Sequence, residues 1–305
     1  MNILPAVLGV LVLASVASAQ ERELQAALKE ARTHGAQSFE VARALGLLGV
    51  FYQDAGRFPE AESAFLNSLN IVNQIAGLQH ESEAPLISRL AWIYIETGET
   101  SRAKRLHLDE WVSRLSKSRS DYLPVMLESA GGVHALKGDF RAAEELFHWD
   151  FDLLTERGDS ASIMMASALN NFGFIQLKAD RYEGALNSFS RALSLWTKLA
   201  GPDDLEVAMT RVGLAETYTH VGRHDDSSEL FVRALPVFET KCGPRSLRTA
   251  DVLDNYAKVL RYQKRKAEAK TFEDRARQIR EAFAANPAPG ASIDVRDLAS
   301  YTGGK

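Results

Sequence analysis

The sequence predicts an all-α solenoid made of helix–turn–helix units. Two observations predict it: turn positions that recur about every 42 residues, and apolar residues at helical spacing before each of them. Successive turn positions are separated by 42, 40, 42, 42 and 42 residues. Six units follow from six such positions: Gly56, Gly98, Gly138, Asp180, Gly222 and Lys264.

Two columns of small residues flank the turn positions. The column seven residues before them holds Gly49, Ala91, Gly131, Gly173, Ala215 and Ala257. The column five residues after them holds Ala61, Ala103, Ala143, Ala185, Ser227 and Ala269. Small residues let two helix backbones approach closely, so each unit is expected to be a pair of antiparallel helices. One pair cannot bury its apolar stripe alone, whereas stacked pairs can.

Residues 1–19 predict a secretory signal peptide. They contain no charged side chain, and the apolar run from Ile3 to Val16 ends at the small residues Ala17-Ser18-Ala19. We therefore expect cleavage near Ala19 and export to a periplasm or to the outside of the cell. An uncleaved N-terminal anchor is the alternative. No membrane span is expected in the mature chain.

The remaining chain divides into three predicted parts. Residues 20–42 are expected to form an N-terminal capping helix, over Leu24–Thr33, and a linker. Residues 43–283 hold the six repeats, and residues 284–305 form a flexible tail. Prolines support the helix boundaries, because three of them stand where a missing N–H costs least, at expected helix starts: Pro59, Pro85 and Pro124.

The repeats resemble a known family. The pattern Leu48-Gly49-x-x-Tyr52 followed by Ala61-x-x-x-Phe65 resembles the tetratricopeptide repeat, and other units repeat its first half. The usual unit has about 34 residues. The longer period, with linkers such as residues 199–208, is similar to the kinesin-light-chain type of this repeat. The resemblance covers about residues 24–280 and implies a right-handed superhelical solenoid of antiparallel helix pairs.

Composition and motifs argue against several functions. The 305 residues are 46% hydrophobic with a formal net charge of −4, which excludes a disordered chain and gives no sign of a nucleic-acid partner. A single cysteine excludes a disulfide framework within the chain. No motif for a catalytic nucleophile, a phosphate loop or a metalloprotease is present. We therefore expect no enzyme, no cofactor and no metal site.

Isolated reactive side chains are expected to be structural. His107 and His224 stand in columns that hold aromatic residues in other units, so we expect them to pack as aromatic rings. Cys242 is expected to be an incidental thiol, although an intermolecular disulfide stays open as an alternative.

Residues 261–280 carry eight basic and three acidic side chains. The solvated face of a terminal capping helix explains this excess more simply than an anionic partner does.

The resemblance implies that the first helix of each unit lines a concave groove that holds an extended peptide. Asn171 and Asn255 match the position where the family often uses Asn to bind peptide backbone. We expect anchoring by Trp92, Phe174 and Tyr262, and pairing with acidic groups by three basic residues: Lys178, Lys258 and Arg261. A tryptophan on such a face is costly without a partner. The predicted groove residues are Arg89, Trp92, Asn171, Phe174, Lys178, Glu216, Asn255, Lys258, Arg261 and Tyr262.

These observations predict an exported, non-catalytic scaffold that binds a protein or peptide segment in its groove. Two alternatives stay open. A small-molecule-binding protein would use the same concavity as a closed apolar pocket. A structural subunit of an envelope assembly, or a self-associating homo-oligomer, would change size with concentration. Fold analogy does not choose among them, because one scaffold hosts many binders.

Overall fold

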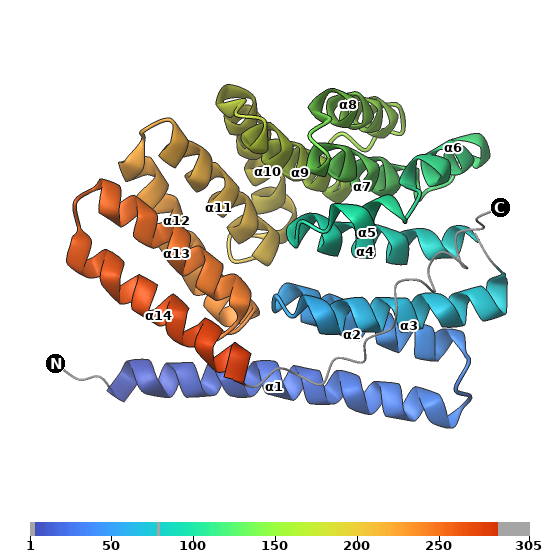
Figure 1. Cartoon of the computed structure of the whole chain (residues 1–305), viewed down its shortest axis with the longest axis horizontal. Coiled ribbons are helices and arrows are strands. Elements are labelled where there is room, and N and C mark those ends of the chain that lie inside the picture. Colours follow the sequence, from blue (N-terminus) through green and yellow to red (C-terminus); the bar gives the residue numbers. More distant parts are fainter. Residues whose placement is uncertain (1–3, 78–79, 286–305) are drawn as a thin grey trace. The chain divides into compact units, whose positions relative to one another are not determined.

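A computed structural model describes residues 4–77 and 80–285 of the protein, and every regular element within them is helical (Figure 1). The predicted flexible tail lies outside the described residues, apart from its first two positions. No helix in the described part of the chain is long and apolar enough to cross a bilayer.

The chain divides into two compact units, each described here by itself. The N-terminal unit includes residues 22–53 and 57–160, and the C-terminal unit is built on residues 161–285. The first helices of the chain are α1 (Leu4–Thr33), α2 (Phe39–Asp54), α3 (Phe58–Ala76), the 3-10 turn η1 (Glu81–Glu83), α4 (Ala84–Glu96), α5 (Thr100–Lys104), α6 (Leu108–Ser118), α7 (Leu123–Leu136) and α8 (Phe140–Glu156). The C-terminal unit contains α9 (Ile163–Lys178), α10 (Tyr182–Ala200), α11 (Leu205–His220), α12 (His224–Lys241), α13 (Leu247–Tyr262) and α14 (Lys266–Ala285).

The predicted turn positions are confirmed. All six adopt a positive φ, between 57° and 82°, which reverses the chain between the two helices of a pair. Glycine enters this region without strain, whereas Asp180 (φ 57°) and Lys264 (φ 64°) adopt it as non-glycine residues. The helices that follow the linkers between pairs begin with side-chain N-caps. The side chains of Ser162, Asp204 and Ser246 accept hydrogen bonds from backbone N–H groups at the starts of α9, α11 and α13.

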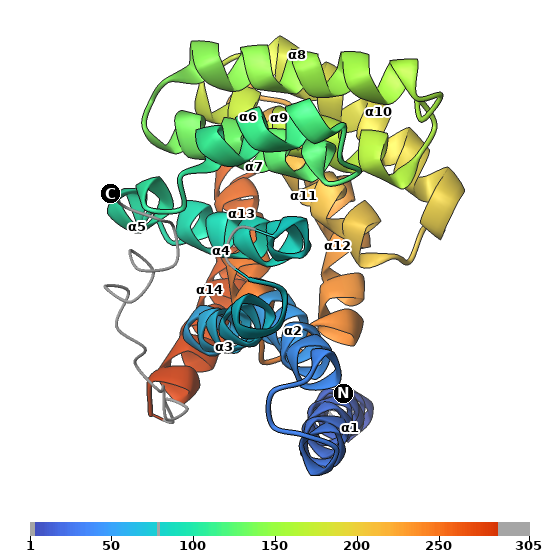
Figure 2. The same ribbon diagram turned by 90° about the vertical axis from the view of Figure 1, so that its right-hand side faces the viewer.

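The small-residue column lets the two helices of a pair pack closely. A Cβ atom on Gly173 of α9 would lie 2.8 Å from the ring of Phe189 on α10, and one on Gly49 of α2 would lie 2.5 Å from the ring of Phe65 on α3. Both rings are fully buried. The helices of the third pair, α7 and α8, lie side by side in both views (Figure 1, Figure 2). Close helix approach therefore depends on the absence of a side chain at these positions.

The N-terminal helix is longer than the predicted capping helix. α1 runs continuously from Leu4 to Thr33, whereas the sequence predicted a separate helix from Leu24. Leu28 is buried in a cluster with Val41 of α2 and Val72 of α3, so the last part of α1 covers the first helix pair. This contact agrees with the capping role.

The prediction that His107 packs as an aromatic ring is wrong. The second helix of the second pair is broken into α5 and α6, and His107 stands at the break with φ 50° and an exposed side chain. Its neighbours Leu106 and Leu108 are both buried. Residues two apart point to nearly opposite sides of a helix, so burying both leucines requires a break that turns His107 outward.

A buried pair of acids interrupts the core of the third helix pair. Asp150 of α8 is fully buried and Glu128 of α7 is 4% exposed. Neither carboxyl oxygen of Asp150 has a hydrogen-bond partner among the described residues. Burial, assisted by the negative charge of Glu128, raises the pKa of Asp150 to about 9, although Arg157 opposes the shift. Four other repeats carry small buried residues at the corresponding position: Ser68, Ala192, Ala234 and Ala276.

Candidate functional site

The first helices of the C-terminal unit form one continuous layer, because α11 contacts both α9 and α13. Eight of the predicted groove residues lie on these helices and are half-buried or exposed. Six of them define what we call the α9–α11–α13 face: Asn171, Phe174, Lys178, Glu216, Asn255 and Lys258.

A hydrogen-bonded chain joins three residues of this face. The Nδ2 atom of Asn255 donates to Oε1 of Glu216 at 2.5 Å, and Nζ of Lys258 donates to Oδ1 of Asn255 at 3.0 Å. The amide of Asn255 therefore uses one of its two N–H donors toward a carboxylate and one of its two acceptor lone pairs toward an ammonium group. These two bonds orient the amide and leave its second N–H and its second lone pair for a ligand. The structure thus brings together three residues that the sequence placed on two separate helices.

Phe174 provides an apolar ring on α9 that lies next to α11. Its ring meets that of Phe189 edge-on, with the centroids 4.9 Å apart. A Cβ atom on Gly213 of α11 would lie 3.1 Å from the Phe174 ring, so the ring lies against the backbone of the next first helix. Asn171 is half-buried one turn earlier and donates to the hydroxyl of Ser167 at 3.4 Å, while Lys178 is exposed in the last turn.

Two predicted ligand-binding residues are engaged within the protein. Arg261 forms two hydrogen bonds with Glu273 of α14, at 2.5 and 2.6 Å, and these lower the pKa of the Glu273 carboxyl. Tyr262 is 62% exposed and stacks on His224, with the ring centroids 4.7 Å apart and the planes at 2°. The expectation that His224 packs as an aromatic ring is confirmed.

A second stack of the same kind was missed by the sequence reasoning. Tyr182 at the start of α10 stacks on His220 at the end of α11, with centroids 5.1 Å apart. Both stacks have the same layout. One ring lies at the start of the second helix of a repeat, and the other lies at the end of the first helix of the following repeat, 38 residues later in the sequence. That spacing could have been found, because it is the repeat period less the length of one turn.

In the N-terminal unit the predicted site residues behave differently. Trp92 is half-buried rather than unsupported, because its ring lies against α7: a Cβ atom on Gly132 would be 3.3 Å from it. Trp92 was predicted as a ligand anchor on an exposed face, and the structure shows that its ring already packs in part within this unit. Arg89 is exposed and donates to Gln53 at 3.4 Å.

The basic excess in residues 261–280 is largely compensated. Arginines of α14 and the preceding turn pair with acids of α12, α13 and α14. These pairs are Arg265 with Glu268, Arg275 with Glu239, Arg277 with Asp274, and Arg280 with Asp251 and Asp254. The interpretation as the solvated face of a terminal helix agrees with this pairing.

Metal ligands and the single cysteine are the remaining chemical groups of interest in the described part of the chain. Within the ranges that the structure describes, no three His, Cys, Asp or Glu side chains gather as a metal site requires. Cys242 is buried in the hydrophobic core of the C-terminal unit, and burial raises the pKa of its thiol to about 12. A protonated, buried thiol is a poor nucleophile.

Comparison with known proteins identifies the family. The tetratricopeptide repeat model matches residues 40–109, 164–240 and 206–282, which together are more than half of the chain. The protein belongs to the tetratricopeptide repeat family.

Its repeats are of the kinesin-light-chain-like type. Kinesin light chain-related protein 3 of Arabidopsis thaliana is 24% identical over 269 residues, which are 74% of this chain and 41% of the relative. Kinesin light chain-related protein 2 is 21% identical, over 70% of this chain and 39% of its own length. The chain thus spans about two fifths of the length of these relatives.

Two solved structures show the same fold. BtubC (BKLC) from P. vanneervenii superposes with a TM-score of 0.57 at 21% identity, covering 79% of this chain and 97% of its own. The Rap protein complexed with competence and sporulation factor superposes with a TM-score of 0.55 at 13% identity, covering 81% of this chain and 76% of its own.

Proposed function

We propose that this protein is a non-catalytic scaffold that binds an extended polypeptide segment across the α9–α11–α13 face. The observation that carries the proposal is the chain from Glu216 through Asn255 to Lys258. The Phe174 ring lies against Gly213 of α11, three residues before Glu216. The tetratricopeptide repeat fold supports a role in protein interaction. The Rap protein, which shares the fold, was solved in complex with competence and sporulation factor.

The chemistry of the face suits an extended segment. Such a segment carries unpaired backbone donors and acceptors, and the oriented amide of Asn255 offers one of each. Lys258 and Lys178 would attract acidic side chains of the segment. Phe174 would receive an apolar side chain, because its ring is already held by Phe189 and loses little freedom on binding.

Removing the polar chain is expected to abolish partner capture. The protein from residue 20 onward, immobilised as bait, should retain a partner from the native envelope or secreted fraction. The double variant Asn255→Ala, Lys258→Ala should reduce that retention at least about tenfold, because a lost pair of hydrogen bonds costs about 1.5–3 kcal/mol. Quantitative mass spectrometry of the eluates measures the ratio.

The matched control is Arg233→Ala, Glu229→Ala, which removes an exposed ion pair from the second helix α12. It should retain the partner like the wild type. Equal retention by the Asn255/Lys258 variant would place the binding surface elsewhere. Retention of the bait's own chain alone would favour the self-associating assembly. Trp92 is unsuitable for substitution here, because its ring is part of the packing between α4 and α7.

We also propose that the protein is exported. The uncharged apolar segment before Ala19 supports this proposal, and tetratricopeptide repeats do not require a particular compartment. Expression of the full chain should yield a mature protein whose N-terminal sequence begins at Gln20 or close to it. Ala17→Leu, Ala19→Leu should block cleavage and leave a longer product. A wild-type product that retains residues 1–19 in the cytoplasmic fraction would argue against export.

A further inference from the structure

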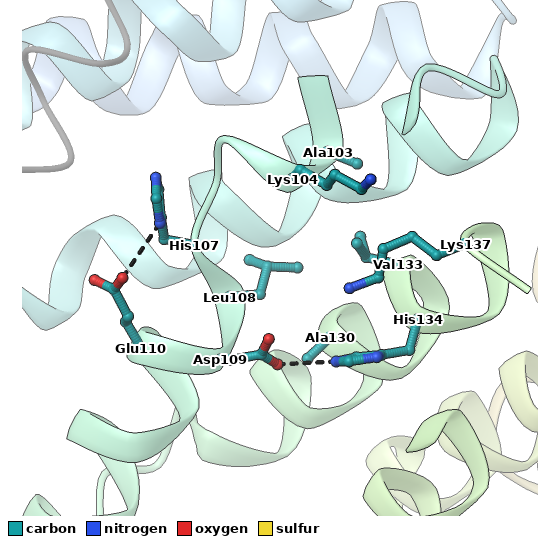
Figure 3. Close-up of a pocket in the computed structure, with 10 residues that line it drawn as sticks. All are labelled: Ala103, Lys104, His107, Leu108, Asp109, Glu110, Ala130, Val133, His134 and Lys137. Carbon is teal, nitrogen blue, oxygen red and sulfur yellow. Dashed lines mark hydrogen bonds and ion pairs between the residues drawn. The ribbon is translucent and has the colours of Figure 1, made fainter. Parts of the chain in front are cut away.

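The break in the outer helix of the second pair leaves a pocket in the N-terminal unit, between the α5–α6 segment and α7 (Figure 3). Its volume is about 140 Å³. It lies where α5 ends at Lys104 and α6 begins at Leu108, so no continuous helix covers this seam. The pocket lies within the N-terminal unit, whereas the α9–α11–α13 face lies within the C-terminal unit.

The floor of the pocket is apolar. Four lining residues are at most 5% exposed and carry only aliphatic side chains: Ala103, Leu108, Ala130 and Val133. A floor of this kind favours a short aliphatic group over a polar one, because burial of such a group removes apolar surface from water.

The carboxylates at the rim are already engaged by imidazoles. Nε2 of His134 lies 3.0 Å from Oδ1 of Asp109, and Nδ1 of His107 lies 3.2 Å from Oε1 of Glu110. On its other side, His134 lies 3.5 Å from the carboxylate of Asp139. The side chains of Asp109 and Glu110 are 70% exposed, so water weakens their repulsion of an incoming anion.

The two lysines of the pocket differ from these groups. Neither Lys104 nor Lys137 forms an ion pair with any residue that the structure describes. Figure 3 shows both stems extending over the pocket, with Lys137 reaching across Val133 toward Leu108. Two ammonium groups above an apolar floor can bind an anion whose stem is aliphatic.

We propose that this pocket binds a short aliphatic carboxylate, with the carboxylate between Lys104 and Lys137 and the aliphatic group against Leu108 and Val133. Drug-sized ligands fill pockets of about 300–1,000 Å³, so a cavity of 140 Å³ suits a single aliphatic side chain together with its carboxylate. The source of the carboxylate is either a free small acid or the C-terminal residue of a polypeptide. Binding of so few atoms is expected with a Kd of about 1 mM.

The test uses N-acetylleucine and N-acetylleucinamide, which differ only in that a neutral primary amide replaces the carboxylate. Titration of the ¹⁵N-labelled full chain from residue 20 is followed by two-dimensional NMR. N-acetylleucine should shift amide signals around Leu108, Val133 and His134, whereas the amide should bind at least tenfold more weakly. Lys104→Gln, Lys137→Gln should weaken the acid tenfold and leave the spectrum of the unliganded protein otherwise unchanged.

The control variant, Lys266→Gln, Lys270→Gln, changes two exposed lysines of α14 and should bind N-acetylleucine like the wild type. Comparing N-acetylleucine with acetyl-Gly-Gly-Leu then assigns the source. A lower Kd for the peptide than for N-acetylleucine indicates that the ligand is a polypeptide C-terminus, and equal Kd values indicate a free acid. Equal binding of acid and amide, or no shift near α7 at 20 times the expected Kd, would overturn the proposal.

Discussion

Replacing Asp150 by alanine is expected to stabilise the protein at neutral pH and to flatten its dependence on pH. Asp150 is fully buried, and its carboxyl oxygens have no hydrogen-bond partner within the described residues. Repeats four, five and six carry alanine at the corresponding buried position, so the smaller side chain fits this kind of helix contact. Removal of a buried, unsatisfied carboxyl should raise the free energy of unfolding by about 2 kcal/mol at pH 7.

The pH dependence follows from the direction of the pKa shift. The pKa of Asp150 is about 9 in the folded protein and about 3.9 in an unfolded chain, so the folded state holds an extra proton between these values. The stability that this proton contributes is fully present below pH 4. It is lost progressively as the pH rises toward 9. The wild type should therefore lose stability over this range relative to Asp150→Ala.

Urea unfolding followed by circular dichroism at pH 5, 7 and 9 measures the effect. The gain from Asp150→Ala should be smallest at pH 5 and largest at pH 9. Asp152→Ala, an exposed acid on the same helix, serves as control and should change stability little at any of the three values. Destabilisation by Asp150→Ala at all three pH values would show that the carboxyl is held by interactions the account lacks.

Substituting alanine for Gly173 is expected to destabilise the C-terminal unit, whereas the same substitution at Gly46 stabilises the N-terminal unit. A Cβ atom at Gly173 would lie 2.8 Å from the buried ring of Phe189. The Phe189 ring has no space to move away, because it also packs against Gly213. A Cβ atom on Gly213 would lie 2.6 Å from the same ring. Overpacking of this kind costs about 1–3 kcal/mol.

Gly46 is the matched control, since it also lies in a helix interior but has room. A Cβ atom there would meet nothing closer than 4.0 Å, so Gly46→Ala should gain about 0.5–1 kcal/mol from its higher helix propensity. Thermal unfolding of the two single variants compares the signs directly. A gain in Tm for Gly173→Ala would mean that the small-residue column does not set the distance between the helices of a pair.

The fold could be predicted from the sequence because the features that define each helix pair are local and recur in every repeat. A turn position with a positive φ, and a glycine or alanine seven residues before it, recur in all six units, so the register could be read from one chain. His107 is an exception to this pattern. Its column predicted an inward ring, but the buried leucines on both sides break the helix and turn it outward.

The candidate site was less predictable, because its arrangement depends on contacts between repeats. Asn255 and Glu216 are 39 residues apart, and only the packing of α11 on α13 brings the amide to the carboxylate. Trp92 was predicted on an exposed face, because its contact with Gly132 is made by the next repeat and is not visible in its own helix. Asp150 illustrates the same limit: a polar residue in a small-residue column gives no sign of whether the partner helix satisfies it.

Position-dependent photo-crosslinking tests the central claim most directly. A photoreactive phenylalanine analogue replaces Tyr262, one turn after Lys258 on α13, in one protein and Arg233 on the outer helix α12 in another, both exposed positions. Irradiation in the native envelope or secreted fraction should give a discrete higher-mass adduct from position 262 and none from position 233. The adduct should disappear when Phe174→Ala is added. Adducts of equal yield from both positions, or from position 233 alone, would contradict binding at this face.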